Sequence, residues 1–356
     1  MITEAFYDPT RSYYENYEEG PFGAFANPIP LERTDAPTET FLGHDVYTRF
    51  GVPAGPLLNS KYVCAALDYG FDLPVYKTVR SGTHGCHEYP NVLPVDVTDD
   101  LTLEKADAGL VTKESYTEPL SITNSFGVPS YEPDTWQPDV ERAITHAKTG
   151  QLVGLSFQGT NAPGVSAEDF IADWVTTAKL AAATGAPYLE ANYSCPNEGT
   201  TNLLCFDIER VGRISRAVKE AIGDVPLLLK ISYFRDDAAL ATLVEEVGGV
   251  VDGFSTINTI SAEVRTPAGE QALPGAGRLR SGVCGETIKW AGLEMVERFA
   301  KLRAASGQDF AIVGVGGVTK AADYHEYLEV GADAVMSATG AMWNTDLAKE
   351  IIDSNV

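Results

Sequence analysis

The sequence is poor in basic residues. Its 356 residues include 26 Lys and Arg against 50 Asp and Glu, which gives a formal net charge of -24. The basic residues form no cluster along the chain. Because nucleic acids and anionic membrane surfaces attract clustered positive charge, this composition argues against both as partners. We interpret the acidity as serving solubility.

Long apolar runs and paired cysteines are also missing. No run of about 18 apolar residues is present, so the sequence predicts no membrane-spanning helix. The first 20 residues carry acids where a secretory signal has basic and then apolar residues. The five cysteines are odd in number and lack CxxC spacing, which argues against a disulfide framework and against a metal site. We therefore expect a cytoplasmic protein without a bound metal.

After residue 45, short apolar segments typical of strands alternate with amphipathic segments typical of helices. Strands are expected at 52–56, 75–79, 153–158, 188–192, 227–231, 254–258, 310–314 and 334–338. Helices are expected at 166–185, 207–223, 285–307 and 320–331. This alternation predicts an α/β protein with a (β/α)8 TIM barrel over residues 46–356, and an open doubly wound sheet is the alternative. Residues 1–45 are expected to form an irregular N-terminal arm.

Polar residues lie at or just after the carboxyl ends of the expected strands. They are Lys77, Gln158, Asn192, Lys230, Asn258 and Gly316. This placement favours the barrel, because barrel enzymes build their active sites on that face. Two long segments, 81–151 and 259–285, interrupt the strand–helix period and are expected to be functional insertions at the same face.

Two glycine-rich segments suggest a phosphate site. The segments VGVGGV (313–318) and ADAVMSATGAM (332–342) each join a strand to a helix, at the last two expected strands. Backbone N–H groups at such turns bind phosphate in many barrels, although ordinary turns use glycine too. Lys77 and Lys230 lie in apolar strands, where a lysine either forms an ion pair or contacts a ligand. Together these features indicate an anionic cofactor across the barrel mouth.

Amide side chains gather at the same rim. Asn124, Asn192, Asn197 and Asn258 follow expected strands or lie in the loops beyond them. An amide offers both a donor and an acceptor, so several amides could bind a planar ring with alternating C=O and N–H groups. Each Asn alone could equally be a turn former. Cys195 lies among them and could be a nucleophile, a proton acceptor or a small buried residue.

With these residues assembled, the chain resembles class 1 dihydroorotate dehydrogenases over residues 50–345. The segment EANYSCPN (190–197) is similar to the family's ELNLSCPN, in which class 1 members have Cys and class 2 members have Ser. Four further motifs match in the same order: YKTVRSG for TKSST, NSFGVP for NSMGLP, LLLKISYF for GVKLPPYF, and VGVGGV for FGCGGV.

The resemblance implies a flavin mononucleotide (FMN) enzyme that oxidises (S)-dihydroorotate to orotate in pyrimidine biosynthesis. It implies hydride transfer from C6 to N5 of FMN, with Cys195 as the base for the C5 proton. Ser194 and loop 198–206 would relay the proton and cover the site, and Lys77 would act near the flavin ring and the substrate carboxylate. The implied substrate-binding residues are Asn124, Phe126, Gly127, Val128, Asn192, Asn197, Asn258 and Thr259. The implied cofactor-binding residues are Ala54, Gly55, Lys77, Thr78, Asn192, Lys230, Ile257, Gly282, Gly316, Gly317, Ala338 and Thr339.

The chain departs from the family pattern in several places. Phe126 replaces Met, Ala338 replaces a phosphate-site Gly, SGVCG (281–285) replaces GGLGG, and the arm and the 81–118 insertion are longer. A related oxidoreductase of another dihydropyrimidine, lactam or enone is therefore an alternative. A flavin-free phosphate-binding lyase or isomerase, with Lys230 as a Schiff-base residue, is a second.

The resemblance also implies a homodimer. The electron acceptor stays open: fumarate and a separate electron-transfer subunit are both options. The chain has no cysteine cluster for an iron–sulfur centre and no GxGxxG fingerprint near its start.

Overall fold

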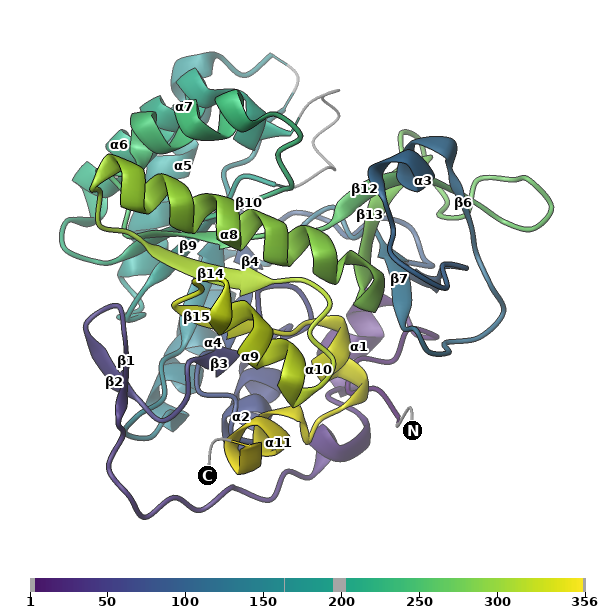
Figure 1. Ribbon diagram of the computed structural model, residues 1–356, viewed down its shortest axis with the longest axis horizontal. Helices are drawn as coiled ribbons and strands as arrows, with labels where there is room; N and C mark the ends of the chain where they lie inside the picture. Colours follow the sequence, from purple (N-terminus) through teal and green to yellow (C-terminus); the bar gives the residue numbers. More distant parts are fainter. Residues whose placement is uncertain (1–3, 163, 195–202, 355–356) are drawn as a thin grey trace.

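The protein is a parallel barrel of eight strands. A computed structural model describes residues 4–162, 164–194 and 203–354 (Figure 1). Hydrogen-bonded neighbours follow the order β3-β15-β14-β11-β10-β9-β8-β4. The strands are β3 (Phe50–Gly51), β4 (Val75–Val79), β8 (Gly154–Phe157), β9 (Leu189–Asn192), β10 (Leu227–Ile231), β11 (Gly253–Thr256), β14 (Ala311–Val315) and β15 (Ala334–Met336). Backbone bonds from Leu73 N to Phe50 O and from Val75 N to Val52 O join the two ends of this order. The predicted (β/α)8 barrel is thereby confirmed.

Seven of the expected strands lie within two residues of the observed ones, but the first expectation was wrong. The segment 52–56 follows the first strand, which ends at Gly51. Pro53 and Pro56 have no N–H to donate to a neighbouring strand, so the apolar run could not continue the ladder.

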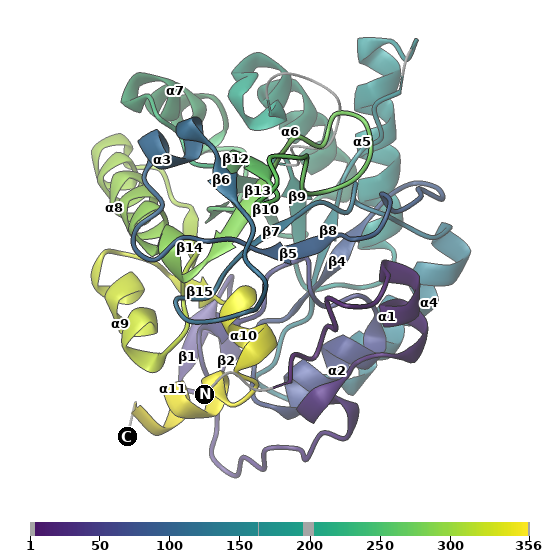
Figure 2. The same cartoon turned by 90° about the vertical axis from the view of Figure 1, so that its right-hand side faces the viewer.

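Helices surround the barrel (Figures 1 and 2). Their bounds are α1 (Tyr13–Glu19), α2 (Ser60–Asp68), α3 (Leu103–Ala108), α4 (Pro133–His146), α5 (Ala167–Ala182), α6 (Ile208–Ile222), α7 (Asp237–Val247), α8 (Lys289–Ser306), α9 (Ala321–Glu329), α10 (Thr339–Trp343) and α11 (Leu347–Ser354). The four expected helices are present as α5, α6, α8 and α9. Helix α5 begins as its sequence indicates, with Ser166 Oγ accepting a hydrogen bond from Asp169 N at 3.0 Å. Sequence patterns did not identify the other seven helices. Among them is α1, so the arm of residues 1–45 is not irregular throughout as expected: Ser12 caps this short helix within it.

The two long interruptions of the period combine into a second sheet. Its order is β5-β7-β13-β12-β6. The strands are β5 (Val92–Pro94), β6 (Leu110–Val111), β7 (Ser121–Asn124), β12 (Ile260–Arg265) and β13 (Arg280–Gly285). Strand β13 pairs with β7 in an antiparallel register that sets Gly282 opposite Asn124. Figures 1 and 2 show this sheet at one end of the barrel, so both insertions lie at the same face.

The barrel interior is apolar at one end and polar at the other. Leu228 belongs to an interior cluster, whereas Leu227 and Leu229 pack outward under the helices. At the amino-terminal end of the strands, Phe41 of the hairpin β1 (Glu39–Phe41) and β2 (His44–Val46) packs edge-on against Tyr188, with 5.8 Å between ring centroids. Polar interior residues begin with Glu190, which pairs with Leu228 in the register, and continue with Lys230 and Asn192 toward the carboxyl ends.

A buried carboxylate connects the N-terminal region to the barrel. Asp72 accepts hydrogen bonds from Thr48 N at 2.9 Å and Thr48 Oγ1 at 2.7 Å. The Arg33 guanidinium lies 3.1 Å from the same carboxylate. Burial nevertheless raises the pKa of Asp72 to about 6, against the opposing effects of Arg33 and of the hydrogen bonds. The charge state of Asp72 is therefore coupled to folding.

We expect Asp72→Asn to remove a pH-dependent part of the stability. Between the ordinary pKa of 3.8 and about 6, the folded protein holds the Asp72 proton while the unfolded chain releases it. The free energy of unfolding of the parent therefore falls with rising pH across this window, by about 3 kcal/mol relative to the variant. Urea unfolding of both proteins from acidic to neutral pH measures this difference. A constant difference across the window would contradict the raised pKa.

Candidate active site

A cavity lies between the carboxyl ends of the barrel strands and the second sheet. It has about 1060 Å³ of space not filled by atoms, including the part open to solvent. The residues predicted from sequence that line it are Ala54, Gly55, Lys77, Thr78, Asn124, Phe126, Val128, Asn192, Lys230, Asn258, Thr259, Gly282, Ala338 and Thr339. Lining residues that sequence reasoning did not identify are Tyr7, Pro53, Pro56, Val92, Ile122, Cys284, Val315 and Met342.

The remaining predicted residues lie outside this lining set. Ser194, Gly127, Ile257, Gly316 and Gly317 are described but do not line the cavity surface. Cys195 and Asn197 lie outside the described residues, as does most of loop 198–206.

A chain of hydrogen bonds links the polar side chains at three strand ends. Asn258 Nδ2 donates to Ser194 Oγ at 2.8 Å, and Ser194 Oγ donates to Asn192 Oδ1 at 3.2 Å. Asn192 Nδ2 donates to Gln158 Oε1 at 3.0 Å. Because each bond uses a defined end of an amide, the chain fixes how Asn192 and Asn258 face the cavity. Ser194 is buried at its centre, directly before Cys195 in the sequence.

Lys230 enters the cavity from β10. Its Nζ donates to Ser255 Oγ on the neighbouring strand β11 at 3.1 Å. Burial lowers the pKa of Lys230, and the Glu190 carboxylate opposes that shift. Glu190 lies on β9, and neither of its buried carboxylate oxygens has a hydrogen-bond partner among the described residues. Lys230 thus faces the cavity with its Nζ hydrogen-bonded to the neutral Ser255 hydroxyl, an arrangement that favours a hydrogen-bond acceptor on a ligand.

Lys77 lies at another wall of the cavity, at the centre of β4. Its Nζ is 3.4 Å from Gly55 O. The same Nζ lies 5.1 Å from the ring centroid of Phe126 and 5.7 Å from that of Tyr13. Because aromatic faces attract an ammonium group, these contacts hold the Lys77 side chain at the cavity wall.

Hydrogen bonds from neighbouring segments hold the backbone of the loop after β7. His87 N donates to Phe126 O at 2.9 Å, and Arg278 Nη2 donates to Ser125 O at 2.8 Å. Arg80 Nε donates to Val128 O at 3.0 Å. Gly127 has a φ of 76°, and a Cβ on it would lie 2.5 Å from His87 Nε2, so this position requires glycine. The loop of Phe126, Gly127 and Val128 is therefore rigidly placed beside Lys77.

Thr339 at the start of α10 lines the cavity, and the glycine turn after the neighbouring strand β14 lies outside the lining set. Gly316 and Gly317 have φ values of 130° and 70°. Thr339, the first residue of α10, donates from Oγ1 to Cys284 Sγ at 3.4 Å, and Asn124 Nδ2 donates to the same sulfur at 3.5 Å. Burial raises the pKa of Cys284, which favours the neutral thiol. The only sequence signal for Cys284 was its place in SGVCG, where the family has glycine.

The described residues contain no group of three or more His, Cys, Asp or Glu side chains that could hold a metal ion. No helix in this part of the chain is long and apolar enough to cross a membrane.

Comparisons with known proteins agree with this architecture. The family model described as dihydroorotate dehydrogenase matches residues 114–354. A dihydroorotate dehydrogenase of Dictyostelium discoideum is 35% identical over 99% of this chain and 98% of its own. A dihydroorotate dehydrogenase (quinone) of Kineococcus radiotolerans is 29% identical over 90% of this chain and 80% of its own. A crystal structure of ligand-free dihydroorotate dehydrogenase from Eimeria tenella matches with a TM-score of 0.69 and 21% identity, over 92% of this chain and 89% of that one.

Proposed function

This chain belongs to the dihydroorotate dehydrogenase family, and from that premise we propose that it is a class 1 member in which Cys195 is the base. The reaction is the oxidation of dihydroorotate to orotate in pyrimidine biosynthesis, an oxidoreduction of a CH–CH donor with FMN as cofactor. The curated relatives include both quinone-dependent enzymes and catalytic subunits of NAD-dependent complexes, so the class is argued from the residues. The observation that carries it is the thiol in SCPN (194–197).

The cavity fits FMN. Gly55 lines the cavity, and a Cβ on it would meet no atom within 4 Å, which leaves open space for a flat ring beside it. Lys230 supplies a buried ammonium donor that is hydrogen-bonded to the neutral Ser255 hydroxyl. Backbone N–H groups of Gly316, Gly317 and Thr339 supply the kind of donor that a phosphate needs. When bound, FMN would supply the acceptor for the hydride that leaves C6 of the substrate.

The chain's own residues perform the remaining parts of the reaction. Lys77 and the loop of Phe126, Gly127 and Val128 bind the substrate carboxylate, because an ammonium group and backbone N–H donors complement an anion. The amides of Asn192 and Asn258, oriented by Ser194, bind the C=O and N–H groups of the ring.

Proton removal from C5 is assigned to Cys195. A thiol with an ordinary pKa of about 8.5 is partly ionised at neutral pH. The thiolate accepts a proton more readily than a serine hydroxyl does. Ser194, hydrogen-bonded and buried directly before it, positions the start of this loop. The proton that leaves C5 goes to Cys195 Sγ, and the electron pair of the broken C5–H bond forms the C5–C6 double bond.

An anaerobic absorption spectrum tests the proposed activity. We expect purified protein to show flavin bands that bleach when L-dihydroorotate is added, because the substrate passes two electrons to the cofactor. D-Dihydroorotate serves as the control, since the cavity is chiral. Bands that persist with the L-enantiomer would move the substrate to another dihydropyrimidine, lactam or enone. A colourless protein that FMN does not reconstitute would overturn the flavin assignment.

We also propose a cytoplasmic homodimer, in line with class 1. Sedimentation of the purified protein tests the dimer. Steady-state assays with fumarate, NAD⁺ and a soluble quinone as electron acceptors test the class. Turnover with the quinone alone would contradict the class 1 proposal.

A further inference from the structure

Tyr7 is a cavity residue that comes from the N-terminal arm, far from the barrel in sequence. It lines the cavity and is only 2% exposed. Its hydroxyl is buried and has no hydrogen-bond partner among the described residues. Buried hydroxyl groups are nearly always paired, because an unpaired one loses its bonds to water without replacement. An unpaired donor at a cavity wall therefore points to a partner that occupies the cavity.

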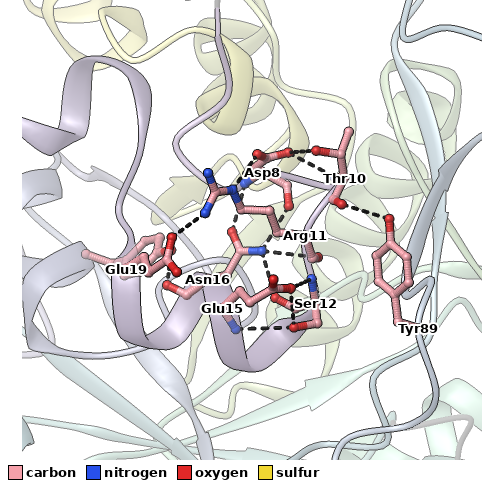
Figure 3. A network of polar contacts seen from close by, with 9 residues as sticks. Asp8, Thr10, Arg11, Ser12, Glu15, Asn16, Glu19 and Tyr89 are labelled. Atoms are coloured by element: carbon pink, nitrogen blue, oxygen red, sulfur yellow. Dashed lines mark hydrogen bonds and ion pairs between the residues drawn. The ribbon is translucent and has the colours of Figure 1, made fainter.

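The backbone on both sides of Tyr7 is fixed. Phe6 N donates to Met342 O in α10 at 3.1 Å. On the other side, Asp8 N donates to Asn16 Oδ1 at 2.8 Å, and Asn16 Nδ2 donates back to Asp8 O at 2.9 Å (Figure 3). These bonds hold the phenol in place before any ligand arrives, as a preorganised binding group requires.

The residues that contact Tyr7 show which part of the cavity its side chain lines. Its ring packs edge-on against Phe126, with 5.8 Å between centroids. Tyr13, also from the arm, packs edge-on against Phe126 from another side at 6.2 Å and lies beside the Lys77 ammonium. The arm thus adds Tyr7 to the cavity wall that contains Lys77 and Phe126, where the proposed function places the substrate, and Tyr13 supports that wall from outside the lining set.

The phenol is suited to donate a hydrogen bond. Burial raises the pKa of Tyr7 far above its ordinary value, with smaller contributions from nearby Cys86 and Tyr62. The hydroxyl therefore keeps its proton at neutral pH. A neutral donor that lines the same cavity as the Lys77 ammonium complements an anionic or carbonyl oxygen.

We infer that the Tyr7 hydroxyl donates a hydrogen bond to the pyrimidine ligand bound beside Phe126, so that the N-terminal arm is part of the substrate site. This inference rests on the proposed function. It makes Tyr7 a binding residue, which acts on affinity for substrate and product and not on retention of the flavin.

The test compares Tyr7→Phe with the parent, both as flavin-loaded enzymes. We expect the dissociation constant for orotate, titrated through the change it causes in the flavin spectrum, to rise about tenfold. The KM for L-dihydroorotate should rise by a similar factor, while kcat changes by less than about threefold. The flavin content of the purified variant should equal that of the parent.

Tyr62→Phe is the matched control. Tyr62 is buried and donates from its hydroxyl to Asn16 O of the arm at 2.8 Å, but it does not line the cavity. We expect this variant to unfold at a lower temperature and to keep the orotate affinity of the parent, whereas Tyr7→Phe should unfold no earlier than the parent.

Unchanged orotate affinity in Tyr7→Phe would overturn the inference. If the variant also lost its flavin, the hydroxyl would instead be assigned to the cofactor. A parent whose flavin bands respond neither to orotate nor to L-dihydroorotate would overturn the proposed function and this inference with it.

Discussion

Cys195→Ala is expected to retain its flavin and to lose about 10²–10⁴-fold in the rate of flavin reduction by L-dihydroorotate. Transfer of a proton to a positioned base contributes a factor of this size, and alanine has no group to accept the proton. Binding should be affected far less, because the groups assigned to the substrate ring and carboxylate lie on other residues. Anaerobic stopped-flow absorbance measures the reduction step directly, without dependence on the electron acceptor.

Cys195→Ser adds a pH readout to the same prediction. A hydroxyl ionises at far higher pH than a thiol, so the rate of flavin reduction should reach its plateau at higher pH in this variant than in the parent. Cys64→Ala is the control, because Cys64 lies on α2 outside the cavity. Equal rates for Cys195→Ala and the parent would remove Cys195 from the mechanism.

Gly317→Ala is expected to yield protein that contains little or no flavin. Gly317 has a φ of 70°, and a Cβ on it would lie 2.7 Å from both the backbone N and the Cα of Lys289. Backbone atoms cannot move aside as a flexible side chain can, so the turn that carries Gly316 must shift. Because the phosphate is proposed to bind at this turn, the shift should weaken FMN binding by at least tenfold.

Gly307→Ala separates the clash from the cost of backbone conformation. Gly307 ends α8 with a φ of 69°, yet a Cβ on it would meet no atom within 4 Å. Both variants place alanine in the left-handed region, which costs about 1 kcal/mol. Only Gly317→Ala adds the contact with Lys289. The measurements are the flavin content and the thermal unfolding of the two variants. Only Gly317→Ala should lose flavin, and equal flavin content in both variants would show that this turn does not support the cofactor.

The barrel and most of its rim could be predicted because their signals are local. Each strand is a short apolar run, and Lys77, Lys230, Asn192 and Asn258 lie within such runs or at their ends, so parallel pairing alone brings them to one face. The first barrel strand was not predicted correctly, since Phe50–Gly51 is too short to show an apolar run or a period.

The rest of the site depends on contacts between distant segments, which leave no local pattern. Two of the pairings in the second sheet, β7 with β13 and β6 with β12, join residues more than 150 positions apart, as with Asn124 and Gly282. Tyr7 comes from an arm without periodicity, and only tertiary packing brings it to the cavity. Cys284 stood out in sequence as a departure from glycine, but its contacts with Asn124 and Thr339 required the structure.

The second sheet also has a consequence for the order in which the protein acquires its site during synthesis. Ser121 and Thr287 share a hydrogen bond across 166 positions, and β7 has its partner β13 only after the ribosome has made residues 280–285. Until then β7 lacks one neighbour, so its free edge could pair with another chain. Because long-range pairing forms slowly, assembly of this sheet should be a late step in folding. Cofactor and substrate can therefore meet a complete cavity only when nearly the whole polypeptide has emerged.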